Sequence, residues 1–123
     1  QTATITAQIA IGEELFNVFI THLGNDGPII QQEQVLQLLE GKDNILLMGD
    51  FNFRPDTDQY RLTTARLKDT WLLRWPQGIS SLEFDSSERI DYLFISPGIN
   101  VSDSQYLTGT QSDHPALFVD IER

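Results

Sequence analysis

The 123-residue sequence predicts an α/β fold in which a mixed β-sheet carries helices on one face. Strand-like patterns at residues 3–11 and 15–23 are separated by a tight turn, which is typical of an antiparallel hairpin. A helical pattern at 29–39 then separates the second strand from an apolar run at 44–48. A helix between two strands favours parallel pairing, so the sheet combines both directions. A chain of this length forms one domain at most.

The predicted hairpin combines two different hydrophobic patterns. In residues 3–11, apolar side chains alternate with polar or small ones, and this period of two is typical of a half-buried strand. The apolar set on that strand is Ala3, Ile5, Ala7, Ile9 and Ile11. After the turn at 12–14, residues 15–23 are almost continuously apolar, as expected of a buried central strand.

A helix is predicted next, because apolar residues fall on one stripe of the segment 29–39. The stripe consists of Val35, Leu36 and Leu39. Pro28 suits the start of this helix and Gly41 its end. The run at 44–48 is apolar after its first residue, which indicates a short buried strand.

The second half of the chain has weaker patterns. Asp56 or Thr57 could cap a helix that runs to about Arg66. Residues 67–71 are interpreted only as a connector, and no element is assigned to residues 72–84. The remaining strands are predicted at 89–95, 101–107 and 115–121.

Three polar motifs stand at the edges of apolar, strand-like runs. They are Gly49-Asp50-Phe51-Asn52, Arg89-Ile90-Asp91-Tyr92 and Ser112-Asp113-His114-Pro115. Taken singly, each is ordinary turn chemistry, because Gly, Asp and Asn are favoured in turns. Together they supply carboxylates, a carboxamide and an imidazole, which metal-assisted phosphate chemistry can use. Hard oxygen ligands suit Mg²⁺ or Mn²⁺, and the absence of cysteine excludes a thiolate metal site.

Alternation along residues 89–95 puts Asp91 on the face of its strand that also carries Leu93 and Ile95. A carboxylate on a largely apolar face needs a partner, because burying it alone is costly. An imidazole would serve, and the hydrogen bond would raise the pKa of that imidazole. The alternative is an edge-strand Asp that faces solvent.

In order and wording, the three motifs resemble the second half of the endonuclease/exonuclease/phosphatase (DNase I-like) superfamily, from about Ile5 to Ile121. That fold is a four-layer α/β sandwich of two similar halves, so the resemblance implies that residues 1–123 form its C-terminal half. The family's metal-binding glutamate lies in the N-terminal half, for which this sequence has no candidate. We therefore expect the chain to be a piece of a longer protein, with the missing half as its partner.

The resemblance implies a Mg²⁺-dependent phosphoester hydrolase. It gives Asp50 the role of orienting or deprotonating the attacking water, and Asn52 and His114 the role of binding the phosphate. It puts Asp113, together with Asp50, at the metal or its water shell. It makes Asp91 the partner of His114. Because Asp50 and Asn52 are two apart on an expected extended backbone, both could point to one side of the sheet edge.

His22 stands in the sequence Thr21-His22-Leu23 at the end of the second predicted strand. A lone His at a strand end is more often structural. This sequence is similar, however, to the DNase I-like, sphingomyelinase-like and inositol-phosphatase-like branches of the superfamily, in which the His assists the leaving group or the phosphate. His22 is therefore a further catalytic candidate.

The chain carries 18 acidic and 8 basic residues, a formal net charge of −10. Proteins that bind duplex DNA normally carry a cluster of Lys and Arg, and the basic residues here form no dense cluster in sequence. This disfavours a nuclease unless the missing half supplies the basic surface. Nucleic acid, a phospholipid head group and a small phosphorylated metabolite all stay open as substrates. The alternative to an enzyme is a non-catalytic relative that acts as a binding or interaction module.

Two expectations concern the isolated chain. Without the metal-binding glutamate, it should be catalytically silent. Helices on one face would leave the other face of the sheet without cover, and an exposed apolar sheet face is an association surface. We therefore expect self-association, with a face-to-face homodimer as the simplest closed form.

Overall fold

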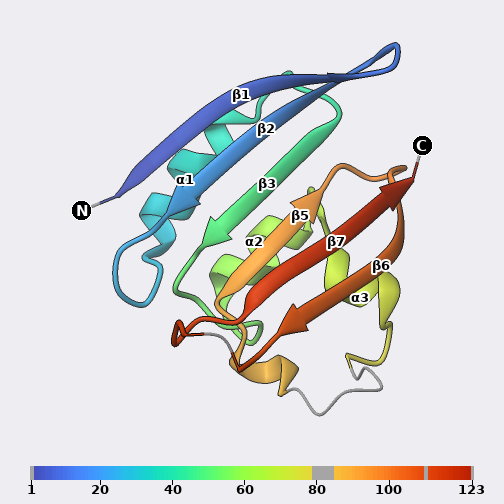
Figure 1. Ribbon diagram of the computed structural model, residues 1–123. Helices are drawn as coiled ribbons and strands as arrows, with labels where there is room; N and C mark the ends of the chain where they lie inside the picture. Colours follow the sequence, from blue (N-terminus) through green and yellow to red (C-terminus); the bar gives the residue numbers. More distant parts are fainter. Residues whose placement is uncertain (1, 79–84, 110, 123) are drawn as a thin grey trace.

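The computed structural model describes residues 2–78, 85–109 and 111–122, and a mixed five-stranded sheet in the order β1-β2-β3-β5-β4 organises it (Figure 1). Its strands are β1 (Ala3–Ile11), β2 (Glu14–His22), β3 (Ile45–Asp50), β4 (Lys68–Asp69) and β5 (Asp91–Ile95). A two-stranded sheet joins β6 (Asn100–Leu107) to β7 (Ala116–Glu122). The helices are α1 (Ile29–Leu38), α2 (Asp58–Thr64), α3 (Thr70–Arg74) and a 3-10 turn at Ser86–Glu88.

The three α-helices lie behind the strands in Figure 1, on one side of the molecule. β7 lies beside β5 in the same view, and the two strands are in contact. Within the part of the chain that the structure describes, no helix is long and apolar enough to cross a membrane. The predicted α/β class, with a mixed sheet and helices on one face, is confirmed.

The predicted hairpin and the predicted parallel crossover are both present. β1 and β2 form an antiparallel hairpin whose register pairs Ala3 with His22. α1 then carries the chain to β3, which runs parallel to β2 from the pair Asn17 and Ile45 onward. β5 pairs antiparallel with the other side of β3. One sheet therefore holds both kinds of pairing, as the crossover predicted.

The main core lies between the sheet and the helices. The predicted stripe of α1 is buried there, and it comprises Val35, Leu36 and Leu39. The strands contribute Phe19, Leu47, Tyr92 and Phe94 to the same cluster. Phe51, directly after β3, is fully buried, and its ring centroid lies 5.4 Å from that of Phe94. This packing anchors the end of β3 at which the first polar motif stands.

The structure settles the cap of one helix and shows more order than predicted in the segment that follows. Thr57 rather than Asp56 caps α2, because its side chain accepts a hydrogen bond from the first turn. The stretch interpreted as a connector forms β4 and α3, since Asp69 caps α3 by accepting a hydrogen bond from the backbone N–H of Trp71 at 3.0 Å. Residues 79–84 of the unassigned stretch lie outside the described residues.

The side of the sheet away from the helices, which we name the outer face, carries an apolar row. Cross-strand pairing aligns Ile5, Ile20, Met48 and Leu93 on β1, β2, β3 and β5. Ile5 is 65% exposed and Ile20 45% exposed. The outer face therefore presents apolar side chains to solvent near the ends of β2 and β3, where His22 and Asp50 stand.

Candidate active site

Four of the predicted site residues meet at one end of the outer face. Strand pairing aligns His22, Asp50 and Asp91 in one row across the ends of β2, β3 and β5. Paired residues of a sheet project to the same face, so these three side chains stand together beside the apolar row. His114 reaches them from the segment that precedes β7.

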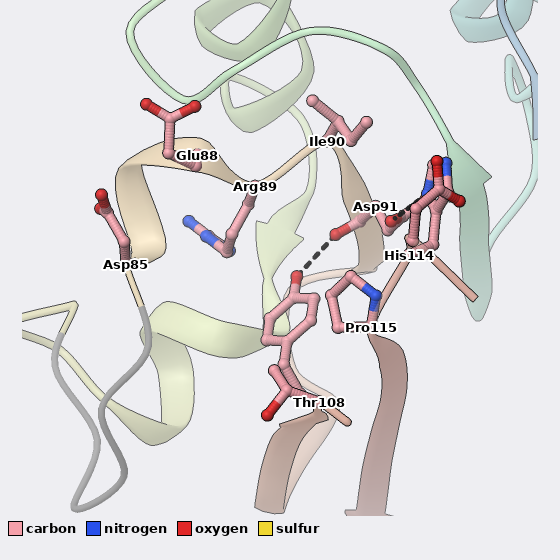
Figure 2. Close-up of a pocket in the computed structure, with 10 residues that line it drawn as sticks. Asp85, Glu88, Arg89, Ile90, Asp91, Thr108, His114 and Pro115 are labelled. Atoms are coloured by element: carbon pink, nitrogen blue, oxygen red, sulfur yellow. Dashed lines mark hydrogen bonds and ion pairs between the residues drawn. The ribbon is translucent and has the colours of Figure 1, made fainter. Parts of the chain in front are cut away.

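His114 lies between two carboxylates. Its Nδ1 is 2.8 Å from Asp91 Oδ2, and its Nε2 is 3.7 Å from Asp50 Oδ2. Figure 2 shows the side chains of Asp91 and His114 pointing toward one another. On the other side, His22 Nε2 is 3.5 Å from the same Asp50 oxygen. Asp50 Oδ2 is therefore flanked by two imidazoles, and the pairing of Asp91 with an imidazole that alternation predicted is present.

The Asp91 and His114 pair binds a proton more tightly than its members would in water. The hydrogen bond to Asp91, together with the negative charge of Asp91, raises the pKa of the His114 imidazole. Burial raises the pKa of Asp91, and this effect exceeds the lowering caused by His114. Both shifts favour a retained proton. Because His114 is the more exposed partner, the imidazole is the group through which this proton meets solvent or a ligand.

The turn after β3 fixes the Asp50 carboxylate. Gly49 has a φ of +144°, and a Cβ there would lie 1.9 Å from the Thr21 carbonyl oxygen, so only glycine fits. The backbone N–H of Asn52 donates to Asp50 Oδ1 at 3.0 Å, and its Nδ2 donates to the Leu23 carbonyl at 2.8 Å. The prediction of an extended backbone between Asp50 and Asn52 is wrong. The chain curls there, with a φ of +57° at Asn52, since Asn52 bridges the carboxylate and the end of β2.

Asp113 stands apart from this cluster. It is exposed, and the group of close acidic and His side chains found among the described residues does not include it. It lines a pocket of about 340 Å³ on which Asp91 and His114 also border. Its role at a metal stays a prediction.

The cluster has the donors of a divalent-cation site. Asp50, Asp91 and His114 each offer one ligand atom, and these atoms all lie within 4.8 Å of one another. Mg²⁺ is commonly held by one or two carboxylates, with water and substrate phosphate as its other ligands, so the two carboxylates of the cluster fit it. Because Asp91 Oδ2 and His114 Nδ1 already bond to each other, Asp50 is the carboxylate most available to a cation.

The sequence did not predict a set of buried polar contacts next to Asp91. Arg89 and Asp69 form an ion pair of 2.9 Å in which both side chains are 2% exposed. The Tyr60 hydroxyl donates to the same carboxylate at 2.5 Å, and the Tyr106 hydroxyl donates to the Asp91 carbonyl at 2.6 Å. Because Arg89 turns inward to Asp69, β5 begins at Asp91, two residues later than the predicted start at 89. The only signal was a charged residue beside a buried strand, which requires a partner without identifying it.

One comparison with known proteins identifies a family, and another finds structures with the same fold. The family model described as the endonuclease/exonuclease/phosphatase family matches residues 21–114, a span that contains His22, Asp50, Asp91 and His114. No curated protein sequence matches the chain significantly.

Several solved structures share the fold. An endonuclease/exonuclease/phosphatase from Beutenbergia cavernae matches with a TM-score of 0.72 and 21% identity, over 98% of this chain and 39% of that one. A mannosyl-6-phosphatase from Bacteroides thetaiotaomicron matches with a TM-score of 0.61 and 23% identity, over 91% of this chain and 53% of that one. D. rerio TDP2 complexed with a single-strand DNA product matches with a TM-score of 0.69 and 13% identity, over 99% of this chain and 62% of that one. This chain therefore spans between 39% and 62% of the length of these three structures.

Proposed function

This chain belongs to the endonuclease/exonuclease/phosphatase family, and we propose that it supplies one half of the active site of a metal-dependent phosphoester hydrolase. The observation that carries the proposal is the row of His22, Asp50 and Asp91 with His114 set against it. Phosphoester hydrolysis needs an activated water, neutralised charge on the phosphoryl oxygens and a proton for the leaving oxygen. These side chains can supply a base for the water and a proton for the leaving oxygen. They can also neutralise part of the charge on the phosphoryl oxygens.

Each role follows from the atoms that are already engaged. Asp50 orients or deprotonates the attacking water through Oδ2, because Oδ1 accepts the Asn52 N–H. His114 donates from Nε2 to a phosphoryl oxygen, because Asp91 holds Nδ1 and raises the pKa of the imidazole. Asn52 binds the phosphate through the second N–H of its carboxamide, since the first is donated to Leu23.

His22 and the cation complete the proposed site. The His22 imidazole is 68% exposed and 3.5 Å from Asp50, a position from which it can assist the leaving oxygen. Mg²⁺ or Mn²⁺, held by Asp50 and in our proposal by Asp113, supplies charge neutralisation at the phosphoryl oxygens when bound. Asp91 acts only through the imidazole of His114.

The substrate is proposed as a class, a phosphoester carried by nucleic acid, a phospholipid head group or a small phosphorylated metabolite. Similar structures include a mannosyl-6-phosphatase and a TDP2 bound to a DNA product, so the fold suits both small and polymeric substrates. The net charge of −10 disfavours a polyanion on this half. A nucleic-acid substrate would therefore need a basic surface on the other half of the domain.

We further propose that residues 1–123 are the C-terminal half of a two-half α/β sandwich, with the partner half in a longer protein. The Mg²⁺-dependent turnover of bis-p-nitrophenyl phosphate and p-nitrophenyl phosphate, with chelator as control, tests both proposals. The longer protein should hydrolyse at least one ester, and the isolated chain neither, because half a site positions phosphate and metal poorly. Turnover by the isolated chain that Asp50→Asn abolishes would overturn the half-site. Absence of turnover by the longer protein would favour a non-catalytic binding module.

Self-association of the isolated chain is expected to proceed through the outer face. Ile5 and Ile20 are exposed cross-strand neighbours there, and burying such a patch favours a face-to-face homodimer. Salt should strengthen the dimer, because each copy carries a charge of −10 that salt screens. Sedimentation velocity should show weaker association for Ile5→Thr. The control is Ile30→Thr on α1, where the side chain is 63% exposed on a helix. A wild-type chain that stays monomeric at high concentration would contradict this expectation.

A further inference from the structure

One edge of β5 lacks a strand partner beside the site. β4 pairs with β5 only through Lys68 with Ile95 and Asp69 with Phe94. Within the described ranges, no strand pairs with Asp91 or Leu93 on that side of β5. Two side-chain hydroxyls bond the backbone there instead. Their acceptors are the carbonyl oxygens of Leu93 and Asp91.

The two hydroxyls bond carbonyl oxygens that are two residues apart on the same edge of β5. Thr70 Oγ1 donates to the Leu93 carbonyl at 2.7 Å, and the Tyr106 hydroxyl donates to the Asp91 carbonyl at 2.6 Å. Figure 2 marks the second bond with a dashed line that ends at Asp91. Asp91 is the first residue of β5, and its opposite edge is paired with Asp50 of β3. The hydrogen bond from Tyr106, which we call the tie, therefore holds the main chain of Asp91, the residue whose carboxylate bonds His114.

Tyr106 is itself held rigidly. Its side chain is buried, and its ring meets Trp71 edge-on with centroids 5.1 Å apart. Its hydroxyl interacts with the guanidinium of Arg89, which the Asp69 carboxylate fixes from the other side. Burial raises the pKa of the Tyr106 phenol, so the hydroxyl keeps the proton that it donates. The tie thus has a fixed position relative to the core.

We propose that Tyr106 is a positioning residue of the site: by holding the Asp91 main chain, its hydroxyl aims the Asp91 carboxylate at Nδ1 of His114. The consequence for turnover rests on the function proposed above, whereas the effect on the Asp91 and His114 pair does not. Without the tie, Asp91 samples positions from which the 2.8 Å contact with His114 is lost. Small displacements of a group that orients an acid or base lower kcat more than they alter KM.

The test compares Tyr106→Phe with Thr70→Val in the longer protein. Phe keeps the ring that packs on Trp71, and each variant deletes one hydroxyl bonded to a β5 carbonyl. Tyr106→Phe also removes the interaction of the hydroxyl with the Arg89 guanidinium, so it should lose at least as much thermal stability as Thr70→Val. The first readout, at one fixed pH, is the ¹H and ¹⁵N signal of the His114 Nδ1–H. Tyr106→Phe should weaken or broaden this signal, and Thr70→Val should leave it at its wild-type position.

The second readout is steady-state turnover of the phosphoester that the wild type hydrolyses. Tyr106→Phe should lower kcat by roughly tenfold or more with KM nearly unchanged, and Thr70→Val should leave both close to wild type. An unchanged His114 signal in Tyr106→Phe, or equal changes in both variants, would overturn the positioning role. If the wild type shows no turnover, the proposed function fails, while the Nδ1–H signal still decides the role of Tyr106.

Discussion

Replacing Asp50 by Asn in the longer protein is expected to lower kcat by about 10²- to 10⁴-fold. The Asn side chain keeps an oxygen that can accept the Asn52 N–H, so the turn after β3 survives while the charge is lost. In the proposed mechanism, the attacking water then lacks its base. His114 lies between Asp50 and Asp91 and is the proposed donor to the phosphate, so His114→Ala should lower kcat by a similar factor.

The values of KM separate these two variants. Asp50→Asn should leave KM nearly unchanged, whereas His114→Ala should raise it, since His114 in our proposal binds the phosphate before as well as during reaction. Asp120→Asn on β7 is the matched control: it removes one exposed negative charge outside the acidic and His cluster. Steady-state kinetics at saturating Mg²⁺ measures all three. A wild-type kcat in either site variant would remove that residue from the mechanism.

Asp91→Asn is expected to shift the alkaline limb of the kcat profile to lower pH. The hydrogen bond to Asp91 and the charge of Asp91 raise the pKa of His114, so in the wild type the protonated imidazole persists to higher pH. Activity that needs this cation is full below that pKa and falls as the pH rises through it. Without the carboxylate, the pKa returns toward its usual value and the fall begins earlier. At the optimum, kcat should drop about 10- to 100-fold, the range typical of losing a carboxylate that orients a metal-bound imidazole.

Two measurements check this expectation together. The pH dependence of kcat reports the catalytic step, and NMR titration of the His114 ring reports its pKa directly. Asp120→Asn again controls for the loss of one charge and should leave both curves in place. An Asp91→Asn enzyme with the wild-type limb and the wild-type His114 pKa would show that the 2.8 Å contact does not tune the imidazole.

Much of the fold could be predicted because its causes are local. Alternation in 3–11 and the apolar run in 15–23 set the hairpin, and the helix after it forces the parallel crossover to β3. The site row then follows from the register of those strands, since His22 and Asp50 end neighbouring strands as a cross-strand pair. Motifs at strand ends therefore carried most of the positional information about the site.

What could not be predicted depends on partners distant in sequence. The left-handed turn at Asn52 exists because its carboxamide reaches Leu23, 29 residues earlier. Arg89 points inward because it pairs with Asp69, which lies 20 residues earlier in the chain. No periodic pattern in the sequence indicates that these two residues meet. The same holds for Tyr106, whose hydroxyl serves a carbonyl 15 residues earlier on an edge left open by the two-residue strand β4. Contacts of this kind appear only once the strands are placed in space.

Whether Asp50 and His114 act on one phosphate as a unit is tested most directly by the kcat of the double variant Asp50→Asn with His114→Ala. Groups that work in one step are non-additive, because once one is lost the other has little left to stabilise. The double variant should therefore be no more than about threefold slower than the slower single variant. A loss equal to the product of the two single losses would contradict a shared site.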